Sequence, residues 1–369
     1  MGRRRELGVD SVCCLLHNLI PGGSGWQWVH LLGRHVERGG RATICAPPGP
    51  LAEPARAAGI EVVPTSWAEE GEAARAGAWD AIERHDVAIV HWDHMVMEAF
   101  VPALKLCGRA ALVAHQAPHG LARWFGPEIL PSVRVPIEAA AAESNAVVLV
   151  RGEAHRRRIA DAFEVPPDRL RILPASIPLA GVAFRPAAAE PVEVLAMVRL
   201  SPEKEPVPRL AIELVRAQLD AGRPCRLTVA GDGPLRDEMM MLCEQRLPAG
   251  PWRVERAPRD PIARLAAADL VVAQGLTTLE AAALGRRVVV AKAVDDGRAG
   301  GIVLTPDGYD EAARDPFGQP PLSTDTERLW AEALALGDRD LRALRQLVEK
   351  RNSLKVASRA LGRALKATA

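Results

Sequence analysis

The chain has 369 residues, which suits two domains of ordinary size better than one. Hydrophobic residues make up 48% of the chain and charged residues 25%, a balance that indicates a packed globular protein rather than a disordered one. The formal net charge is only +1. Because no excess of basic residues is available to attract phosphate backbones, we expect no nucleic-acid partner.

The cysteines and the apolar runs bear on the cellular compartment. None of the six cysteines forms a C-x-x-C pair, and several, such as Cys13 and Cys14, stand within apolar runs. We therefore expect buried free thiols and a reducing, cytoplasmic environment. The first residues, MGRRREL, lack the apolar stretch of a secretory signal, and no run approaches the ~18 apolar residues that span a bilayer. We expect no integral membrane segment, and no pattern specifies an oligomeric state.

In the first half of the chain, short apolar runs alternate with helical stretches. The first run, Val12–Leu16, is followed by a glycine-rich turn at 21–25 and a helical stretch from Trp26 to about Arg38. Strands that are apolar on both faces and alternate with helices predict a parallel sheet covered on both sides. The later predicted strands of this half are Ala42–Ala46, Ile60–Pro64, Asp86–Trp92, Ala110–His115, Ala146–Val150 and Leu170–Pro174.

The pattern stops and then restarts in the second half. The segment 184–191 (FRPAAAEP) is rich in proline and alanine and has no apolar period, so we interpret it as a linker. The sequence thus predicts two Rossmann-like α/β domains in tandem, with the N-terminal one over 1–183 and the C-terminal one over 184–345. The predicted strands of the second domain are Val192–Leu200, Arg226–Ala230, Trp252–Arg256, Leu270–Ala273, Arg287–Lys292 and Ile302–Thr305.

The last part of the chain has a basic amphipathic helical pattern over about 340–365. We favour a packing helix, and a helix lying on a membrane surface is the alternative. In the division into domains we give this segment the bounds 346–369, as a C-terminal helix that can pack back on the N-terminal domain.

Histidines and tryptophans are concentrated in the first half. Every histidine lies at or before His155, and six of the eight tryptophans lie at or before Trp124. The first domain therefore has the groups for proton transfer and the aromatic faces that can stack on a sugar. In open parallel sheets, ligands bind beyond the carboxyl ends of the strands. Two such sheets would provide a wall for each of two substrates.

Three motifs of the second half suit a nucleotide. VRLSPEKE places Arg199 and Lys204 after a predicted strand, a cationic pair that suits a diphosphate. AGDGPLR is a glycine-rich turn, and AQGLTTLEAAALG places Gly275 before a helical stretch that contains Glu280. Because an unpaired buried carboxylate is costly, a hydroxyl-bearing ligand is a natural partner for Glu280. Solvated basic side chains, an ordinary turn and an exposed glutamate are the structural alternatives.

In order and spacing these motifs resemble the retaining glycosyltransferases of family 4, known also as glycosyltransferases group 1. That family shows a G-R-L-x-x-x-K-G segment, a G-x-G-P turn and an E-x(7)-E motif ending in E-A-x-A-x-G. The segments here are VRLSPEKE, GDGP and LEAAALG. In the first half, PGGSGWQ, IVHWDH, LVAHQAPHG and the stretch 139–176 are similar to further family segments. The resemblance covers roughly 12–305 and implies the GT-B fold, two Rossmann-like doubly wound parallel-sheet domains facing a central cleft.

The resemblance implies a role for individual residues. Arg199 and Lys204 would hold the donor diphosphate and offset charge on the leaving group, with His115 near the reacting sugar as the third catalytic candidate. Glu280 would bind the ribose hydroxyls. The further donor-binding candidates are Gly22, Gly23, Arg256, Ala257, Gln274, Gly275, Leu276 and Thr277. The acceptor-binding candidates are Trp26, Trp92, His94, His119 and Trp124, and Trp28 could join the same aromatic wall.

The sequence departs from the family at several positions. The first glutamate of E-x(7)-E should stand eight residues before Glu280, where this chain has Val272. That glutamate usually contacts the donor sugar, so the identity of the sugar is open, and Gln274 is a candidate substitute. Val198 and Glu205 stand where the family has the glycines that flank its basic segment, and Ala175-Ser176 replaces an N-G pair.

We expect a retaining, metal-independent glycosyltransferase of the hexosyltransferase type, EC 2.4. It would transfer a sugar from a nucleoside diphosphate donor, a UDP- or GDP-sugar, to a small soluble acceptor, as in specialised-metabolite or natural-product biosynthesis. No cofactor is expected, and no H-E-x-x-H, paired-aspartate or G-x-S-x-G motif is present. Two alternatives stay open. One is an enzyme of the same fold that uses an unusual activated sugar or forms a C–N or C–S bond. The other is a catalytically silent nucleotide-binding partner subunit.

Overall fold

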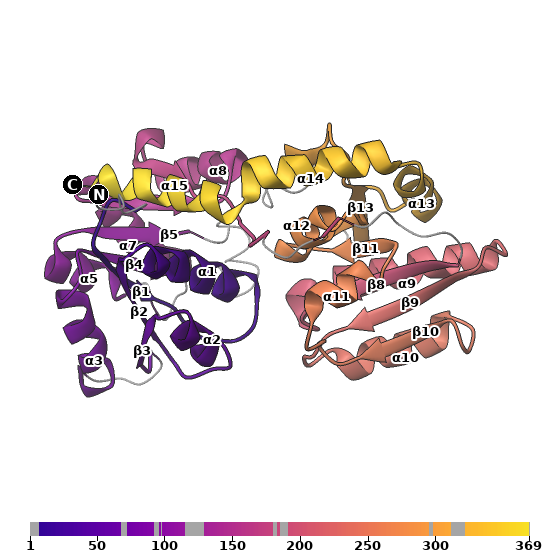
Figure 1. Cartoon of the computed structure of the whole chain (residues 1–369), viewed down its shortest axis with the longest axis horizontal. Coiled ribbons are helices and arrows are strands. Elements are labelled where there is room, and N and C mark those ends of the chain that lie inside the picture. The colour runs from indigo at the N-terminus through magenta and orange to yellow at the C-terminus, as the bar shows by residue number, and fades with distance from the viewer. Residues whose placement is uncertain are drawn as a thin grey trace. The chain divides into compact units, whose positions relative to one another are not determined.

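The structure is a computed structural model, which describes residues 7–67, 72–91, 96, 98–114, 129–179, 183–184, 191–294, 298–310 and 322–368. The chain divides into two compact units (Figure 1). The first unit comprises residues 1–176 and 354–369, and the second comprises 177–353. The predicted divisions at 183/184 and 345/346 lie seven and eight residues from these bounds.

The described strands of the first unit form one parallel sheet in the order β3-β2-β1-β4-β5-β6-β7. Every neighbouring pair is parallel, as the apolar runs predict. The order reverses between β1 and β4, so the carboxyl ends of these two strands define the topological switch point of the sheet. The strands are β1 (Ser11–Leu15), β2 (Arg41–Ala46), β3 (Glu61–Pro64), β4 (Val87–His91), β5 (Ala110–Val113), β6 (Ala146–Val150) and β7 (Leu170–Ile172).

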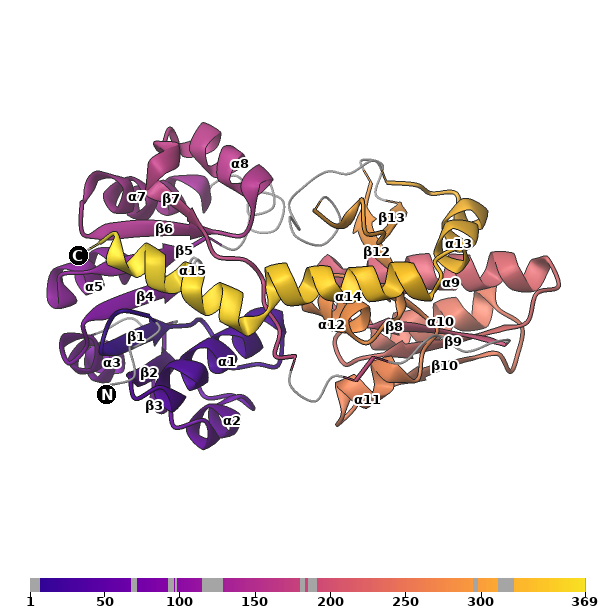
Figure 2. The same ribbon diagram turned by 45° about the horizontal axis from the view of Figure 1, so that its top comes forward.

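Helices cover both faces of this sheet (Figure 2). Side chains of α1, α2 and α15 form a core with one face, and those of α3, α5, α7 and α8 form a core with the other. The described helices of the unit are α1 (Gly23–Glu37), α2 (Ala52–Ala57), α3 (Glu72–Glu83), α5 (Phe100–Cys107), α7 (Ile129–Ala142), α8 (Glu153–Phe163), the short η1 (Pro167–Arg169) and α15 (Leu354–Lys366).

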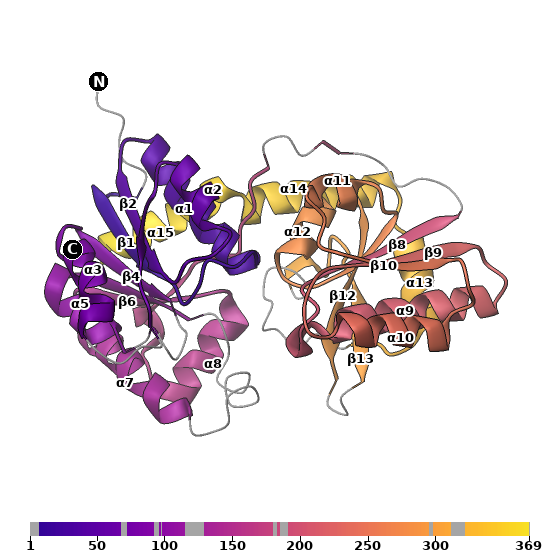
Figure 3. The same ribbon diagram turned by 90° about the horizontal axis from the view of Figure 1, so that it is seen from below.

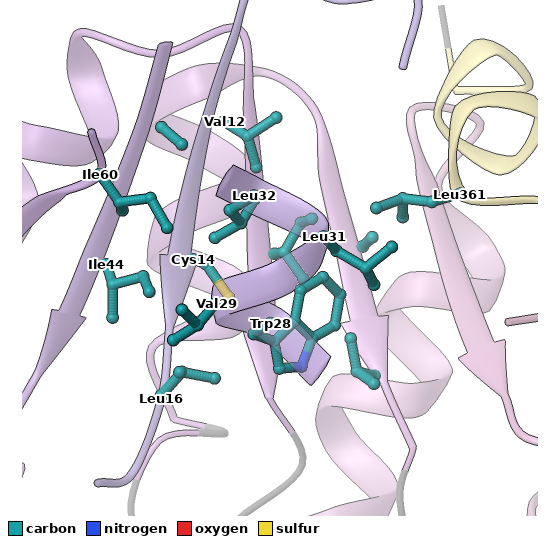
Figure 4. Close-up of a cluster of buried hydrophobic side chains, with 14 of the residues drawn as sticks. Val12, Cys14, Leu16, Trp28, Val29, Leu31, Leu32, Ile44, Ile60 and Leu361 are labelled. Carbon is teal, nitrogen blue, oxygen red and sulfur yellow. The ribbon is translucent and has the colours of Figure 1, made fainter. Parts of the chain in front are cut away.

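The alternation of side chains along β1 explains why both faces of the strand are apolar. Val12 and Cys14 point into the core shared with α1, whereas Cys13 and Leu15 point into the core on the opposite face. Figure 4 shows the first of these cores, in which Trp28 of α1 packs among aliphatic side chains. Every cysteine is a free thiol and all but the half-buried Cys107 are buried, so this expectation is confirmed.

The described strands of the second unit form a sheet in the order β10-β9-β8-β11-β12-β13, with a switch point between β8 and β11. Helices α9, α10 and α13 cover one face, and α11, α12 and α14 cover the other (Figure 3). The strands are β8 (Val192–Met197), β9 (Cys225–Ala230), β10 (Trp252–Glu255), β11 (Leu270–Ala273), β12 (Arg287–Ala293) and β13 (Ala299–Val303). The helices are the short η2 (Pro202–Lys204), α9 (Pro206–Asp220), α10 (Arg236–Arg246), α11 (Pro261–Ala266), α12 (Leu276–Ala283), α13 (Thr326–Leu334) and α14 (Asp338–Asn352).

The prediction of an all-parallel sheet is wrong for the last strand of this unit. β13 pairs antiparallel with β12, with Ala293 opposite Ala299. A parallel strand would need a crossover of a dozen or more residues, but only 294–298 separate the two strands. The chain can therefore only turn back on itself, and the sheet is mixed at this edge.

The C-terminal amphipathic pattern forms two helices instead of one. Helix α14 ends at Asn352 and α15 begins at Leu354, because Ser353 between them has an extended backbone (φ −70°, ψ 152°). Helix α14 belongs to the second unit and α15 to the first. The apolar face of α15, including Ala357, Leu361 and Leu365, is buried in the core shared with α1. This burial matches the favoured interpretation as a packing helix.

Candidate functional site

The predicted nucleotide motifs follow four neighbouring strands of the second unit. Arg199 and Lys204 follow β8, the turn Gly231–Gly233 follows β9, Arg256 follows β10, and Gln274 follows β11. Because these strands are parallel neighbours, their carboxyl ends lie along one edge of the sheet. The tertiary structure thus brings together segments that are separated by up to about 75 residues in sequence.

The glycine-rich turn after β9 is fitted against the segment that follows β8. Leu200 N–H donates to the carbonyl of Asp232 (2.9 Å), and Leu235 N–H donates to the carbonyl of Leu200 (3.0 Å). Gly233 has a φ of +147°, and a Cβ at this position would lie only 2.2 Å from the Leu200 carbonyl oxygen. Glycine is therefore required here for close packing of the two segments.

The segment after β10 is tied to the same turn. The backbone N–H of Ala257 donates to a carboxylate oxygen of Asp232 (3.1 Å). The Arg256 guanidinium lies 3.8 Å from that carboxylate, and its side chain is 83% exposed. An ion pair with this much exposure adds little stability, so Arg256 stays available to a ligand. The structure places Arg256 and Ala257 beside the glycine-rich turn, at the β10 end of the edge.

Lys204 spans the switch point of the second unit. Its ammonium donates to the side-chain oxygen of Gln274 (2.8 Å), which links the segment after β8 to the segment after β11. Burial lowers the pKa of the Lys204 ammonium, Glu203 raises it, and Arg199 lowers it. Arg199 itself is exposed, and in the described part of the chain no side chain is bonded to it. This arrangement leaves two positive groups at one end of the sheet.

Helix α12 begins directly after this point. Its N-cap is Gly275, whose φ of +69° is readily adopted only by glycine, and no side chain among the described residues caps the helix. The first turn contains no acidic residue, and the half-buried Leu276 and Thr277 belong to it. The N–H groups of a first helical turn have no intrahelical partner and carry a partial positive charge. This helix end can therefore accept an anion.

Glu280 lies one turn further along α12 and is half-buried. Burial raises the pKa of its carboxyl group. Among the residues that the structure describes, none is bonded to this carboxylate. The hydroxyl group of Thr278, which is only 2% exposed, also has no partner within these residues. An unsatisfied carboxylate at a half-buried position is suited to a ligand with hydroxyl groups.

Val272, at the position of the missing family glutamate, lies inside the sheet. It is 0% exposed and stands in β11 opposite Ala196 on β8 and Val289 on β12. Strand β11 ends at Ala273 and α12 begins at Leu276, so only Gln274 and Gly275 separate the strand from the helix. A longer loop that could present a carboxylate is absent from this junction. Gln274 is the first polar residue that follows Val272 in the chain.

The switch point of the first unit is lined by rings. His17 follows β1 and His91 ends β4, and their imidazoles stack with centroids 6.3 Å apart. Burial lowers the pKa of the His91 imidazole well below its usual value, and the neighbouring Arg151 and His17 lower it further. The environment of His91 therefore favours the neutral form of its imidazole. The Trp28 indole and the His91 ring are nearly perpendicular (86°), with centroids 6.4 Å apart.

A buried hydrogen-bonded pair lies near these rings and was not predicted from the sequence. Arg151 follows β6, and its guanidinium donates to the side-chain oxygen of Gln27 on α1 (2.9 Å). The amide nitrogen of Gln27 donates to the carbonyl of Pro174 (3.1 Å). Burial lowers the pKa of Arg151 to about 10, so the guanidinium remains charged at pH 7. The position of Arg151 directly after an apolar strand was a signal for this residue, although not for its pairing with Gln27.

The glycine loop and the tryptophans of α1 differ in their accessibility. Gly22 is the N-cap of α1 and Gly23 is its first residue, with no acidic side chain in the first turn. Trp26 is half-buried and stacks on His30 with centroids 5.3 Å apart. Trp28 is 0% exposed and belongs to the core (Figure 4), so its assignment to an acceptor wall is wrong. Along a helix, residues two apart do not face each other, which explains the difference.

Five predicted site residues lie outside the described residues, namely Trp92, His94, His115, His119 and Trp124. Their roles remain predictions. Within the described ranges, no group of three histidine, cysteine, aspartate or glutamate side chains is arranged to hold a metal ion. No described helix has both the length and the apolar character needed to cross a membrane.

Comparison with known proteins finds solved structures of similar fold. The sequence matches no family model and no curated protein. Among solved structures, HepE from Anabaena in complex with UDP-glucose superposes with a TM-score of 0.72 at 14% identity, over 96% of this chain and 99% of that one. A glycosyltransferase from Rickettsia africae superposes with a TM-score of 0.70 at 10% identity, over 98% of each chain. WaaG, a glycosyltransferase involved in lipopolysaccharide biosynthesis, gives a TM-score of 0.65 at 14% identity, over 95% of this chain and 98% of that one.

Two of these neighbours are glycosyltransferases by name, and the protein shares with all three the GT-B fold of two Rossmann-like units. The predicted fold class of two Rossmann-like parallel-sheet domains is thus confirmed, apart from the antiparallel strand β13. At such low identity the likeness shows the fold alone, because one fold supports many functions.

Proposed function

We propose that this protein is a glycosyltransferase that transfers a sugar from a nucleoside diphosphate donor to an acceptor. The observation that carries the proposal is the cluster at the switch point of the second unit. There the Lys204 ammonium, the exposed Arg199, the N-terminal end of α12 and the Glu280 carboxylate follow two neighbouring strands, and no described side chain caps that helix end or bonds to that carboxylate. These groups suit the two ends of one ligand, a diphosphate and a sugar ring with hydroxyl groups.

The fold supports the same proposal. HepE is a GT-B protein that was solved with UDP-glucose, and WaaG is a glycosyltransferase. We extend this likeness to a UDP- or GDP-sugar donor, retention of configuration as in family 4, and a small soluble acceptor in natural-product biosynthesis. A cytoplasmic location and chemistry without a metal or cofactor belong to the same proposal.

In the proposed reaction, the bond between the sugar carbon and the diphosphate oxygen breaks, and a bond to the acceptor hydroxyl oxygen forms. The proton of the hydroxyl group passes to the leaving diphosphate. Arg199 and Lys204 offset the negative charge that develops on this leaving group, and the N–H groups of Leu276 and Thr277 add to the stabilisation. Glu280 binds the ribose hydroxyls and so fixes the nucleotide end of the donor. His115 is proposed near the reacting sugar.

The experiment begins with binding. Thermal stabilisation of the purified protein is measured with UDP, GDP, ADP and dTDP, and then with the matching nucleotide-sugars. We expect one diphosphate to raise the melting temperature, since a ligand that binds only the folded state stabilises it. No shift with any of the four would overturn the proposal. In the second stage, hydrolysis or transfer of the sugar from the matching donor is measured through the diphosphate that is released.

Val272 favours a second candidate within the same fold. Because this side chain is buried in β11, no carboxylate stands at the position where the family contacts the donor sugar. The second candidate is an enzyme that takes an unusual activated sugar or forms a C–N or C–S bond. Suppose that a nucleotide raises the melting temperature but common hexose donors are not turned over. This result would favour the second candidate, or a catalytically silent nucleotide-binding subunit, over the first proposal.

A further inference from the structure

Gln274 occupies the junction between β11 and α12 and bonds in two directions. Its side-chain oxygen accepts from the Lys204 ammonium (2.8 Å). Its side-chain nitrogen donates to the carbonyl oxygen of Ala291 on β12 (3.3 Å). The side chain therefore connects three segments that follow or form neighbouring strands of the second sheet.

The two partners determine which way the amide points. A lysine ammonium can only donate and a backbone carbonyl can only accept, so the amide oxygen must face Lys204 and the nitrogen must face Ala291. The Ala291 carbonyl belongs to a buried strand residue and cannot move away. Gln274 is thereby held in one orientation, with its oxygen directed at the ammonium.

The partner of Lys204 is neutral, and this has an electrostatic consequence. In the described part of the chain, no carboxylate is bonded to the Lys204 ammonium. Glu203 and Arg199 are the charged neighbours that influence it, and they act in opposite directions. An amide oxygen satisfies one N–H of the ammonium without cancelling its charge, whereas a carboxylate would form an ion pair.

We infer that Gln274 is a positioning residue, which holds the Lys204 ammonium at the switch point through a neutral oxygen and so leaves its full charge for a phosphate-bearing ligand. This inference rests on the proposed function, because it names what prepares the same site for a diphosphate. It also assigns Gln274 a different task from that of a direct sugar contact. The side chain acts through Lys204.

The test uses two variants of nearly the same size and shape as glutamine. Gln274→Met removes the oxygen that accepts from Lys204, and Gln274→Glu replaces it with a charged one. Gln245→Glu is the matched control, since it makes the same charge change on the exposed face of α10. Circular dichroism melts of all variants in the full-length chain establish that they are folded.

Two quantities are measured for each protein. The first is the Kd of whichever of UDP, GDP, ADP and dTDP binds the wild type, between about pH 7.5 and 10.5, above the last phosphate pKa. The second is the pKa of the Lys204 ammonium without ligand, from the NMR signals of labelled lysine side chains. The Lys204 signal is identified by its absence in Lys204→Arg.

We expect the two variants to weaken binding for opposite electrostatic reasons. In Gln274→Met the ammonium loses an acceptor that favours its charged form, so its pKa falls, and Kd rises about tenfold. In Gln274→Glu the carboxylate raises the Lys204 pKa but competes with phosphate, so Kd again rises about tenfold or more. The alkaline loss of binding moves to lower pH in the first variant and to higher pH in the second.

The possible outcomes separate this inference from the proposed function. If the wild type binds none of the four diphosphates, the proposed function is overturned, and the inference with it. If the wild type binds but both variants keep the wild-type Lys204 pKa, or bind like the Gln245→Glu control, only the inference is overturned. A purely structural role would weaken binding without moving the Lys204 pKa in opposite directions. If one variant does not fold, the sign of the shift in the other still decides.

Discussion

The two units place different kinds of polar groups at equivalent points of their sheets. At the switch point of the second unit, Arg199 is exposed and the Glu280 carboxylate is bonded to none of the described residues. Near the switch point of the first unit, His91 and Arg151 are buried, and Arg151 is bonded to Gln27. The ends of the parallel strands thus carry groups that are available to a ligand in the second unit. In the first unit they carry polar groups that are bonded to each other in the core. Substitutions at the switch point of the second unit should therefore lower activity more than stability. Substitutions near the switch point of the first unit should lower stability.

The largest expected effect is a loss of stability when a tryptophan is removed from the core of the first unit. Trp28→Ala should lower the free energy of unfolding by about 4 kcal/mol, because it leaves a large cavity in the core shown in Figure 4. Trp26→Ala, on the same helix but half-buried, should cost about 1 kcal/mol. Urea unfolding followed by circular dichroism measures both. Equal losses would contradict the division between a core tryptophan and a surface one.

The second prediction concerns the buried pair of the first unit. Gln27→Leu removes the acceptor of the Arg151 guanidinium and should cost about 2 kcal/mol of unfolding free energy, since a buried charge loses a hydrogen bond. Arg151→Met removes the charge itself and should cost less, because it leaves only a neutral amide behind. Urea unfolding of both variants shows which of the two loses more unfolding free energy. A larger loss for Arg151→Met would show that the charge stabilises the unit.

The third prediction moves to the second unit, where activity rather than stability should change. Lys204→Ala should lower kcat/KM at least about tenfold, since a single cation–phosphate contact contributes roughly 1.5 kcal/mol or more. Its melting temperature should remain close to that of the wild type. Lys105→Ala, at an exposed position of α5 in the first unit, is the matched control. Unchanged kinetics in Lys204→Ala would refute the role of this ammonium.

The smallest expected effect is a gain in stability at Glu280. Burial raises the pKa of this carboxyl group in the folded protein above its value in the unfolded chain. The folded state therefore loses stability as pH rises through the interval between the two pKa values, and it has no such penalty below the lower one.

Glu280→Gln should accordingly raise the free energy of unfolding by up to about 1 kcal/mol at pH 7 and leave it unchanged near pH 4, while weakening nucleotide binding. Stability measured by urea at both pH values, with the exposed Glu244→Gln as a control, checks the sign. A loss of stability at pH 7 would show that the carboxylate has a favourable partner in the folded protein.

Local patterns in the sequence were sufficient for the strands but not for their direction at the edge of the sheet. Runs such as Val12–Leu16 are apolar at successive positions, so they predict strands that are buried on both faces, and β1 is such a strand. The antiparallel direction of β13 depends on the short connection at 294–298. The end of α14 at Asn352 was missed because neither proline nor glycine marks a break at Ser353.

The candidate site was predictable only as far as motifs place residues after strands. Arg199, Lys204 and Glu280 were found in this way, because the carboxyl ends of parallel strands form one edge. The pairing of Gln27 with Arg151 joins residues 124 positions apart, and no local pattern indicates it. Trp26 and Trp28 were indistinguishable in composition, and only the packing of α1 separates them.

The sequence by itself determined the two Rossmann-like units and the positions of the groups that can bind a diphosphate, because hydrophobic periodicity and strand ends are local properties. Only the tertiary structure decided what these groups are bonded to. It buried Val272 between neighbouring strands, directed the Gln274 oxygen at Lys204, and left the Glu280 carboxylate without a hydrogen bond to any described residue. Burial and hydrogen bonding arise from segments that are distant in the chain, and they control the charge of each group.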